Sequence, residues 1–477
     1  MSVRVPVFVI GVIVVSFAAC APKTKYVTPT APIAPAFKEN ASWKPPQPRD
    51  TEVRGRWWEL FDDPQLDDLE GRVDVSNQNV RIAEAQFAQA RAFVRGARAN
   101  LYPQVGASPS IAGVQPSGNR AISSFHDAYA DFLLLASVSY EADVWGRLHG
   151  IVEANRTAAQ ATAADVEAAR LSLHAELALD YFTLRGLDRE QALLDTTVAA
   201  YERALELTQN RFQGGLASQA DVALAETQLE TTRAQAVDVA SLRAALEHAI
   251  AVLVGQPASA LALAPAPLTA APPAVPVGMP SDLLERRPDV AAAERRVASA
   301  SAQVGVATAA FYPLLTLSGA GGFESSSIAS WLAGASNFWT AGPTMFVNVF
   351  DAGRRRAAKE QAIAQYDVAT AAYRQSILVA FREVEDQLAA LRVLEEEARV
   401  QDRAVAASER SLTLANNRYR GGVTSYLEVL TAQSAALANE RAAVNILTRR
   451  MNATVLLLKG LGGGWSVASL PILRIPD

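Results

Sequence analysis

The chain carries one stretch twice, first as Asn210-Arg211-Phe212-Gln213-Gly214-Gly215-Leu216 and again, 207 positions later, as Asn417-Arg418-Tyr419-Arg420-Gly421-Gly422-Val423. Other motifs recur at nearly the same spacing: Leu101-Tyr102-Pro103 returns as Phe311-Tyr312-Pro313, and Gly146-Arg147 returns as Gly353-Arg354. Because these motifs recur together, the repeat covers most of the 477 residues. The sequence therefore predicts two similar halves in a pseudo-symmetric fold.

The glycine pair in each copy predicts the turn of a helical hairpin. Glycine often ends a helix because it reaches positive φ without steric cost. Ser218 with Asp221, and Ser425 with Glu428, then stand at the spacing of a capping box that begins the next helix. We expect the hairpin tips near residues 214–218 and 421–425.

The carboxylates Asp221 and Glu428 have a second interpretation. Two carboxylates per chain near the entrance of a pore would form a ring of negative charge that selects cations. A carboxylate three residues after a serine more often closes a capping box, so the spacing favours the structural interpretation.

The segments that flank the tips predict unusually long helices. Helical composition after Gly146 continues to about Phe212, which is roughly 65 residues or about 100 Å of helix. A shorter helix is predicted from Pro64 to about Asn100, with Asp63 as its N-cap. Helices this long need lateral packing, and the last run shows the apolar repeat of a coiled coil. Its residues recur at intervals of seven: Leu430, Leu437, Val444, Met451 and Leu458.

Two strand hairpins are predicted at the other ends of these helices, over residues 102–144 and 311–351. Polar and apolar residues alternate from Gln104 to Ile111 and from Leu315 to Ser318, and a more apolar run lies around Thr344 to Phe350. Strands of about ten residues with this alternation are typical of outer-membrane barrels. Four strands cannot close a barrel, so we expect the chain to oligomerise.

Aromatic residues gather near the predicted strand ends, where interfacial belts of membrane proteins lie. They are Phe125, Tyr129, Trp331, Phe338 and Trp339.

The N-terminus predicts export and lipidation. Arg4 supplies a positive charge, residues 5–17 an apolar run, and Ala18-Ala19-Cys20 the small residues that precede a cleavage site. Cys20 is the single cysteine, which excludes an internal disulfide and favours a covalent lipid on its thiol. An ordinary signal peptide remains an alternative, whereas a membrane anchor is disfavoured because the apolar run is too short to span a bilayer. We expect a signal peptide over residues 1–19 and a lipidated extended segment over 20–62.

Several function classes are excluded or disfavoured. The net charge of −5 is spread without basic blocks, which argues against nucleic-acid binding. Nucleophile elbows, zinc-helix motifs and phosphate loops are missing, so an enzyme is not predicted. The four histidines lack metal-ligand spacing and are interpreted as surface or helix-face residues. No cofactor is expected beyond the lipid on Cys20.

Two further motifs resemble signatures of the outer-membrane factor family, the TolC- and OprM-like ducts of tripartite efflux pumps. They are Trp57-Trp58-Glu59-Leu60-Phe61-Asp62-Asp63-Pro64 and Leu284-Glu285-Arg286-Arg287-Pro288-Asp289-Val290-Ala291-Ala292-Ala293-Glu294. The resemblance implies a mainly α-helical, TolC-like fold with membrane strands. Three protomers would each contribute four strands to a twelve-stranded barrel in the outer membrane, followed by a periplasmic α-barrel with a small equatorial domain.

The same resemblance implies the partners and the residues that meet them. Substrate would pass from an inner-membrane RND-type transporter through a periplasmic adaptor, and this chain would conduct it passively. The adaptor would dock on the tips, at Arg211, Phe212, Gly214, Gly215 and Leu216 of the first copy. In the second copy the docking residues would be Arg418, Tyr419, Gly421, Gly422 and Val423.

The chain then divides into a first repeat over 63–255, a Pro/Ala-rich equatorial segment over 256–280, a second repeat over 281–462 and a tail over 463–477. Two other functions compete with efflux. One is a duct for type I protein secretion. The other is a periplasmic coiled-coil scaffold lipoprotein, which would leave the four predicted strands unexplained.

Overall fold

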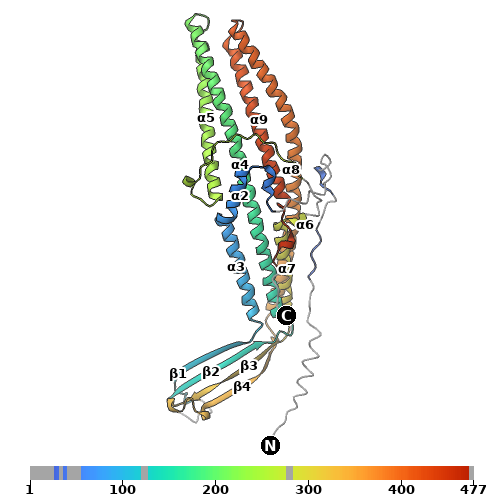
Figure 1. Ribbon diagram of the computed structural model, residues 1–477. Helices are drawn as coiled ribbons and strands as arrows, with labels where there is room; N and C mark the ends of the chain where they lie inside the picture. Colours follow the sequence, from blue (N-terminus) through green and yellow to red (C-terminus); the bar gives the residue numbers. More distant parts are fainter. Residues whose placement is uncertain (1–25, 32–35, 40–54, 120–126, 276–282, 472–477) are drawn as a thin grey trace.

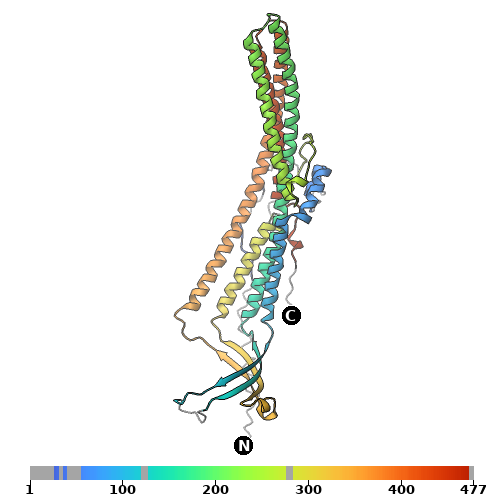
Figure 2. The same cartoon turned by 90° about the vertical axis from the view of Figure 1, so that its left-hand side faces the viewer.

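A computed structural model describes residues 26–31, 36–39, 55–119, 127–275 and 283–471. The molecule is elongated, with a β-sheet at one end and two helical tips at the other (Figure 1). The second view shows that the long helices run between these ends, while short elements and loops gather beside them at mid-height (Figure 2). We call this middle region the equator.

The helices of the two halves match in length. α4 (Arg147–Gln213) and α8 (Arg354–Arg420) each have 67 residues, and α5 (Gln219–Leu253) and α9 (Tyr426–Gly460) each have 35. α4 with α5 and α8 with α9 form the two tip hairpins. At 1.5 Å per residue, each of the longer helices spans about 100 Å, as the sequence predicts.

A second pair of equal helices lies nearer the sheet. α3 (Gln78–Ala99) and α7 (Pro288–Ala309) each have 22 residues and pack against α4. The prediction of a single helix from Asp63 to about Asn100 is wrong, because α2 (Pro64–Ser76) ends at Ser76 and Asn77 separates it from α3. Asn77 is extended, with φ −66° and ψ 126°, and its side chain caps α3 instead. The short α6 (Leu283–Arg286) precedes α7 in the second half.

The core of the molecule lies at the equator. The 3₁₀ helix η4 (Trp57–Phe61) buries Trp57 and Phe61 in a core cluster that also contains Tyr181 of α4 and Leu388 of α8. The Asp63 cap on α2 is confirmed, since its carboxylate accepts from the amides of the next turn and also from the Tyr181 hydroxyl. The dense packing here makes the equator the place where the two repeats and the intervening segment are joined.

The heptad pattern of α9 corresponds to packing against its neighbours. Leu437, Val444, Met451 and Leu458 are buried, and Leu430 is partly buried near the tip. The predicted coiled-coil seam is therefore a buried face of α9.

The strands form one antiparallel sheet in the order β1-β2-β3-β4. β1 (Gln104–Val114) and β2 (Tyr129–Glu141) come from the first repeat, and β3 (Leu314–Ser325) and β4 (Asn337–Phe346) from the second. Proline cannot donate to a strand ladder and is therefore found on edge strands, and both strand prolines, Pro109 and Pro343, lie on β1 and β4.

The fourth predicted strand is misplaced. β4 begins at Asn337 and ends at Phe346, whereas the apolar run suggested a strand around Thr344 to Phe350. Pairing with β3 decides the position, because Phe323 faces Asn337 and Leu314 faces Phe346. Past that point β3 offers no partner, and Val349 and Phe350 lie 90% and 85% exposed in the connection to α8.

Aromatic side chains lie at both ends of the sheet. Tyr129, Phe338 and Trp339 are at the end far from the helices, where Phe132 also contacts Trp331 at 5.7 Å between ring centroids. Phe125 lies outside the described residues. A cluster that the sequence did not reveal lies at the other end: Trp145 stacks on Tyr312 at 4.9 Å and donates to the Pro313 carbonyl.

The described N-terminal residues follow α7 and α8. The Tyr26 hydroxyl donates to Glu294 at 2.8 Å, and the amides of Lys38 and Glu39 donate to Glu385 at 2.6 and 3.0 Å. This segment is therefore tied to the second repeat. Of the helices in the described ranges, none is both long and apolar enough to cross a bilayer.

Candidate functional site

Both tips end their first helix with the same backbone motif. Gly215 and Gly422 have φ values of 68° and 73°, whereas the preceding Gly214 and Gly421 remain near −80° and −76°. The amide of Leu216 returns to the Arg211 carbonyl at 2.8 Å, and that of Val423 to the Arg418 carbonyl at 3.0 Å. This is a Schellman ending, which needs a left-handed residue at the position of the second glycine.

The side chain of Arg211 crosses from the first tip to the second. Its guanidinium lies 4.8 Å from the ring centre of Tyr419 and donates to the Arg420 carbonyl at 3.2 Å. Tyr419 is 5% exposed and packs edge-on against Tyr426. A cation over an aromatic ring contributes about 0.5–2 kcal/mol, so Arg211 holds the two tips of a protomer together.

The equivalent residues do not make the reciprocal contact. Arg418 pairs with Glu428 of its own hairpin at 3.2 Å. Phe212, which corresponds to Tyr419, is 44% exposed. Within one protomer the bridge therefore runs in one direction, from the first tip to the second.

The capping box is present at one tip. Ser218 accepts from the Asp221 amide at 3.1 Å, and the Asp221 carboxylate accepts from the Ser218 amide at 2.9 Å, as predicted. The prediction for the second tip is wrong: the Ser425 side chain makes no capping bond, and the Glu428 carboxylate pairs instead with Arg418 and the Thr424 hydroxyl. Both carboxylates are engaged in bonds within their own tips.

The tips also present apolar groups to the surroundings. Leu216 and Val423 are each 71% exposed, and they stand beside the open glycines. An added Cβ at Gly215 would meet no atom within 4 Å, and at Gly422 only the Arg211 guanidinium at 3.9 Å. The tips thus carry small, exposed apolar groups with free space beside the glycines.

A matching pair of contacts lies at the equator, and we call these the first and second equatorial joints. In the first joint the Asn77 side chain donates to the Leu253 carbonyl at 2.7 Å, at the end of α5. In the second, Arg287 donates to the Gly460 carbonyl at 3.2 Å, at the end of α9. Leu253 and Gly460 are related by the 207-residue offset of the repeat.

Each joint also contains a glycine in the left-handed region. Gly255 has φ 70°, and an added Cβ would lie 2.3 Å from the Ser76 carbonyl oxygen. Gly462 has φ 91°, and its Cβ would lie 2.0 Å from the Arg286 carbonyl oxygen. The end of each tip hairpin therefore packs directly on the backbone that precedes α3 or α7.

Sequence reasoning missed one charged cluster at the equator. His174 is only 5% exposed, so the surface interpretation is wrong for this residue, which lies on a buried face of α4. It bonds to Glu70 and Asp74 of α2, four residues apart on one helix face. Pairs of acidic residues at this spacing are too common to have signalled a buried partner about a hundred positions away.

The chain is similar to known proteins over nearly its whole length. A family model described as outer membrane efflux protein matches residues 71–256 and 279–463. The toluene efflux pump outer membrane protein TtgC of Pseudomonas putida is 31% identical over 473 residues, which cover 98% of this chain and 95% of the relative. OprJ, an outer membrane protein of Pseudomonas aeruginosa, is 31% identical over 467 residues, 97% of each chain.

Solved structures agree with this relationship. The outer-membrane channel OprN superposes with a TM-score of 0.88 at 30% identity, over 94% of this chain and 100% of that one. The open state of the MtrE channel of Neisseria gonorrhoeae gives a TM-score of 0.81 at 26% identity, over 92% and 97% of the two chains. The fold is TolC-like, and passive conduction through such a channel needs no cofactor. The chain thus belongs to the outer membrane efflux protein family: it is the outer-membrane channel of an efflux pump, extends into the periplasm and is not an enzyme.

Proposed function

We propose that three copies of this chain form one exit duct, whose twelve strands close a barrel in the outer membrane. The observation that carries the proposal is the four-stranded sheet, in which β1 and β4 are open edges and most strand residues are exposed. Unpaired strand edges are not tolerated in a bilayer, so β1 of one protomer has to pair with β4 of the next. Purified protein should migrate as a heat-sensitive trimer, and a stable monomer in detergent would contradict the proposal.

The tips are the proposed docking site for a periplasmic adaptor, which receives substrate from an inner-membrane RND-type transporter. The exposed Leu216 and Val423 and the open space at Gly215 and Gly422 support this role. Of the flanking aromatic residues, Phe212 is exposed to a partner, whereas Tyr419 is buried. A helix of the adaptor could cover these apolar side chains and so bury them on docking.

Replacement of Gly422 tests the docking site. Gly422→Trp should abolish efflux-dependent resistance in cells while trimers still assemble, because the indole would occupy the space that the adaptor needs. Gly422→Ala is the matched control, since it carries the same strain at positive φ without the bulk. Wild-type resistance in the tryptophan strain would refute docking at this tip.

Asp221 and Glu428 are proposed to shape the tips and not to select ions. Both carboxylates are engaged locally, by Ser218 and by Arg418. In planar bilayers the double variant Asp221→Ala, Glu428→Ala should therefore keep the cation selectivity of the wild-type channel. A marked loss of selectivity would restore the entrance ring as the better interpretation.

Cys20, which lies outside the described residues, is proposed to carry the lipid. Palmitate labelling should be lost in Cys20→Ser, and the variant should still form the duct if the barrel alone anchors it. Labelling that persists in this variant would rule out lipidation at Cys20.

The proposed substrates are small organic compounds. Relatives are named for efflux of toluene and of antibiotics, and the family resemblance extends over both repeats. A deletion strain should gain sensitivity to solvents, dyes or antibiotics in a panel, and plasmid-borne protein should restore tolerance.

A further inference from the structure

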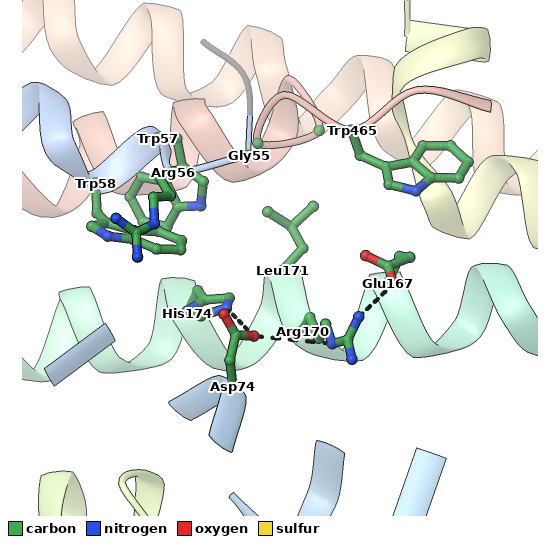
Figure 3. A pocket seen from close by; sticks show the side chains of 12 residues that line it. Gly55, Arg56, Trp57, Trp58, Asp74, Glu167, Arg170, Leu171, His174 and Trp465 are labelled. Carbon is green, nitrogen blue, oxygen red and sulfur yellow. Dashed lines mark hydrogen bonds and ion pairs between the residues drawn. The ribbon is translucent and has the colours of Figure 1, made fainter. Parts of the chain in front are cut away.

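His174 lies near the middle of α4 and joins this helix to α2. Its Nδ1 is 2.6 Å from Glu70 Oε2, and its Nε2 is 3.2 Å from Asp74 Oδ1. The imidazole stacks on Trp58 with 4.5 Å between ring centroids. Figure 3 shows His174 between Trp58 and Asp74, with Asp74 in turn facing Arg170. Both ring nitrogens are therefore committed to carboxylates of one neighbouring helix.

The two carboxylates differ in their access to water. Glu70 is fully buried, and its Oε1 atom has no hydrogen-bond partner among the described residues. The Asp74 side chain is 48% exposed and borders a cavity of about 490 Å³ that also reaches His174 (Figure 3). Protons can thus enter the cluster from the cavity side without opening the core.

Other charges around the cluster are largely paired with one another. Arg170 of α4 binds Glu167 of the same helix and Glu84 of α3. Arg56 pairs with Glu59 next to η4. The charged and titratable groups around His174 are Arg56, Glu59, Asp67, Glu70, Asp74, Glu84, Glu167 and Arg170.

Among the described residues, the second repeat shows no such cluster at the matching position. The residue 207 positions after His174 is Phe381, whose ring packs against the apolar core clusters of the equator and of α7 and α8. The same point of the long helix is therefore ionisable in one repeat and apolar in the other.

We propose that the Glu70–His174–Asp74 cluster is a proton-operated clamp, which tightens the contact between α2 and α4 in the first repeat when it takes up a proton. α2 leads directly into Asn77 of the first equatorial joint. The clamp thus sets how firmly the first repeat is held at the equator, while the second repeat is indifferent to pH at this position.

The titration of the two buried groups gives the direction of the effect. Burial raises the pKa of Glu70 to about 7, from 4.5. Burial alone would lower the pKa of His174, but hydrogen bonds to Asp74 and Glu70 raise it to about 9, from 6.5. Both groups bind protons more tightly in the folded state, so their contribution to the clamp is lost as pH rises from about 4.5 toward 9. The hydrogen bond to His174 lowers the pKa of Asp74, so protonation of Asp74 weakens the clamp in more acidic solution.

Hydrogen exchange of the intact trimer in detergent tests the clamp. After correction for the intrinsic rate, amides of α2 should exchange about tenfold or more slowly at pH 5.5 than at pH 8.0, because both groups release protons when α2 opens in this range. Glu70→Gln removes the ionisation with little change in shape, and His174→Phe installs the side chain of the second repeat. In both variants, the ratio of the α2 exchange rates at pH 8.0 and pH 5.5 should be several-fold smaller than in the wild-type protein.

His149→Phe is the control. His149 is exposed, lies near the start of α4, the helix that also carries His174, and pairs with Asp143. This variant should keep the wild-type ratio. Absence of any pH effect in the wild-type protein would overturn the clamp, and so would a ratio that survives unchanged in Glu70→Gln. Since Glu70→Gln is nearly isosteric, a folding defect in His174→Phe would leave the test intact.

Discussion

The first and second equatorial joints share a backbone geometry but use different side chains. In each, a left-handed glycine lies against the carbonyl that precedes the next cap, and a side chain donates to the last turn of the tip hairpin. The donor is the neutral Asn77 in the first joint and the charged Arg287 in the second. Arg287 also needs Asp289 and Glu383 as partners, because it is buried. The backbone contact is therefore the shared requirement, and the donor is interchangeable if its charge is compensated.

The tips differ in the same way. Both keep the Schellman ending, but the first tip caps its second helix with Ser218 and Asp221, whereas the second ties Glu428 to Arg418. Arg211 then links the tips asymmetrically. A duplicated framework has thus acquired two kinds of side-chain bonding without a change in helix length.

The largest expected effect comes from filling the joint glycines. Gly255→Ala and Gly462→Ala should each destabilise the protein by roughly 2–5 kcal/mol, since a Cβ would overlap a backbone carbonyl at positive φ. The apparent melting temperature of the trimer is the measurement. Gly215→Ala is the control, because its φ of 68° is nearly that of Gly255 but its surroundings are open, so it should cost only about 1 kcal/mol. Equal losses at Gly215 and Gly255 would show that the close contact has no role.

A smaller effect is expected from the bridge between the tips. Arg211→Ala should loosen the pair of tips by about 1 kcal/mol, because it removes the cation from Tyr419 and the bond to Arg420. Spin labels on α5 and α9 should report a broader distance distribution between the tips. Arg418→Ala, which breaks a contact within one tip, should leave this distribution nearly unchanged. Equal broadening in the two variants would contradict a one-way bridge.

The smallest effect is expected from replacing the two serines that precede α5 and α9. Ser218→Ala removes a formed capping box and should cost about 0.5–2 kcal/mol of local stability, whereas Ser425→Ala should cost close to nothing. Hydrogen exchange of the first turns of α5 and α9 measures both in one experiment. If Ser425→Ala accelerates exchange as much as Ser218→Ala, then Ser425 caps α9 after all.

Residues that act through local geometry were predicted well from the sequence. The glycine tips, the Asp63 cap and the long helices follow from propensities and spacings within a few turns. The family signatures around Trp57 and Pro288 also lie in continuous stretches, so the fold class and the function could be inferred from them.

Features that depend on distant partners were missed or misplaced. β4 lies earlier than its apolar run suggested, because pairing with β3 fixes its ends. Asn77 resembles any helix residue until Leu253 is seen to accept from it. The Glu428 carboxylate pairs with Arg418 instead of closing the predicted capping box.

The sequence by itself determined that the chain is a duplicated, helical channel subunit with two strand hairpins, because repeats, glycine turns and hydrophobic periods are written along the chain. Only the tertiary structure decided which carbonyl accepts from each joint residue and that Arg211 of the first tip contacts Tyr419 of the second. It also decided that His174 lies between Glu70 and Asp74. Such contacts join residues far apart in sequence, and their energies depend on burial and distance, which no local pattern specifies.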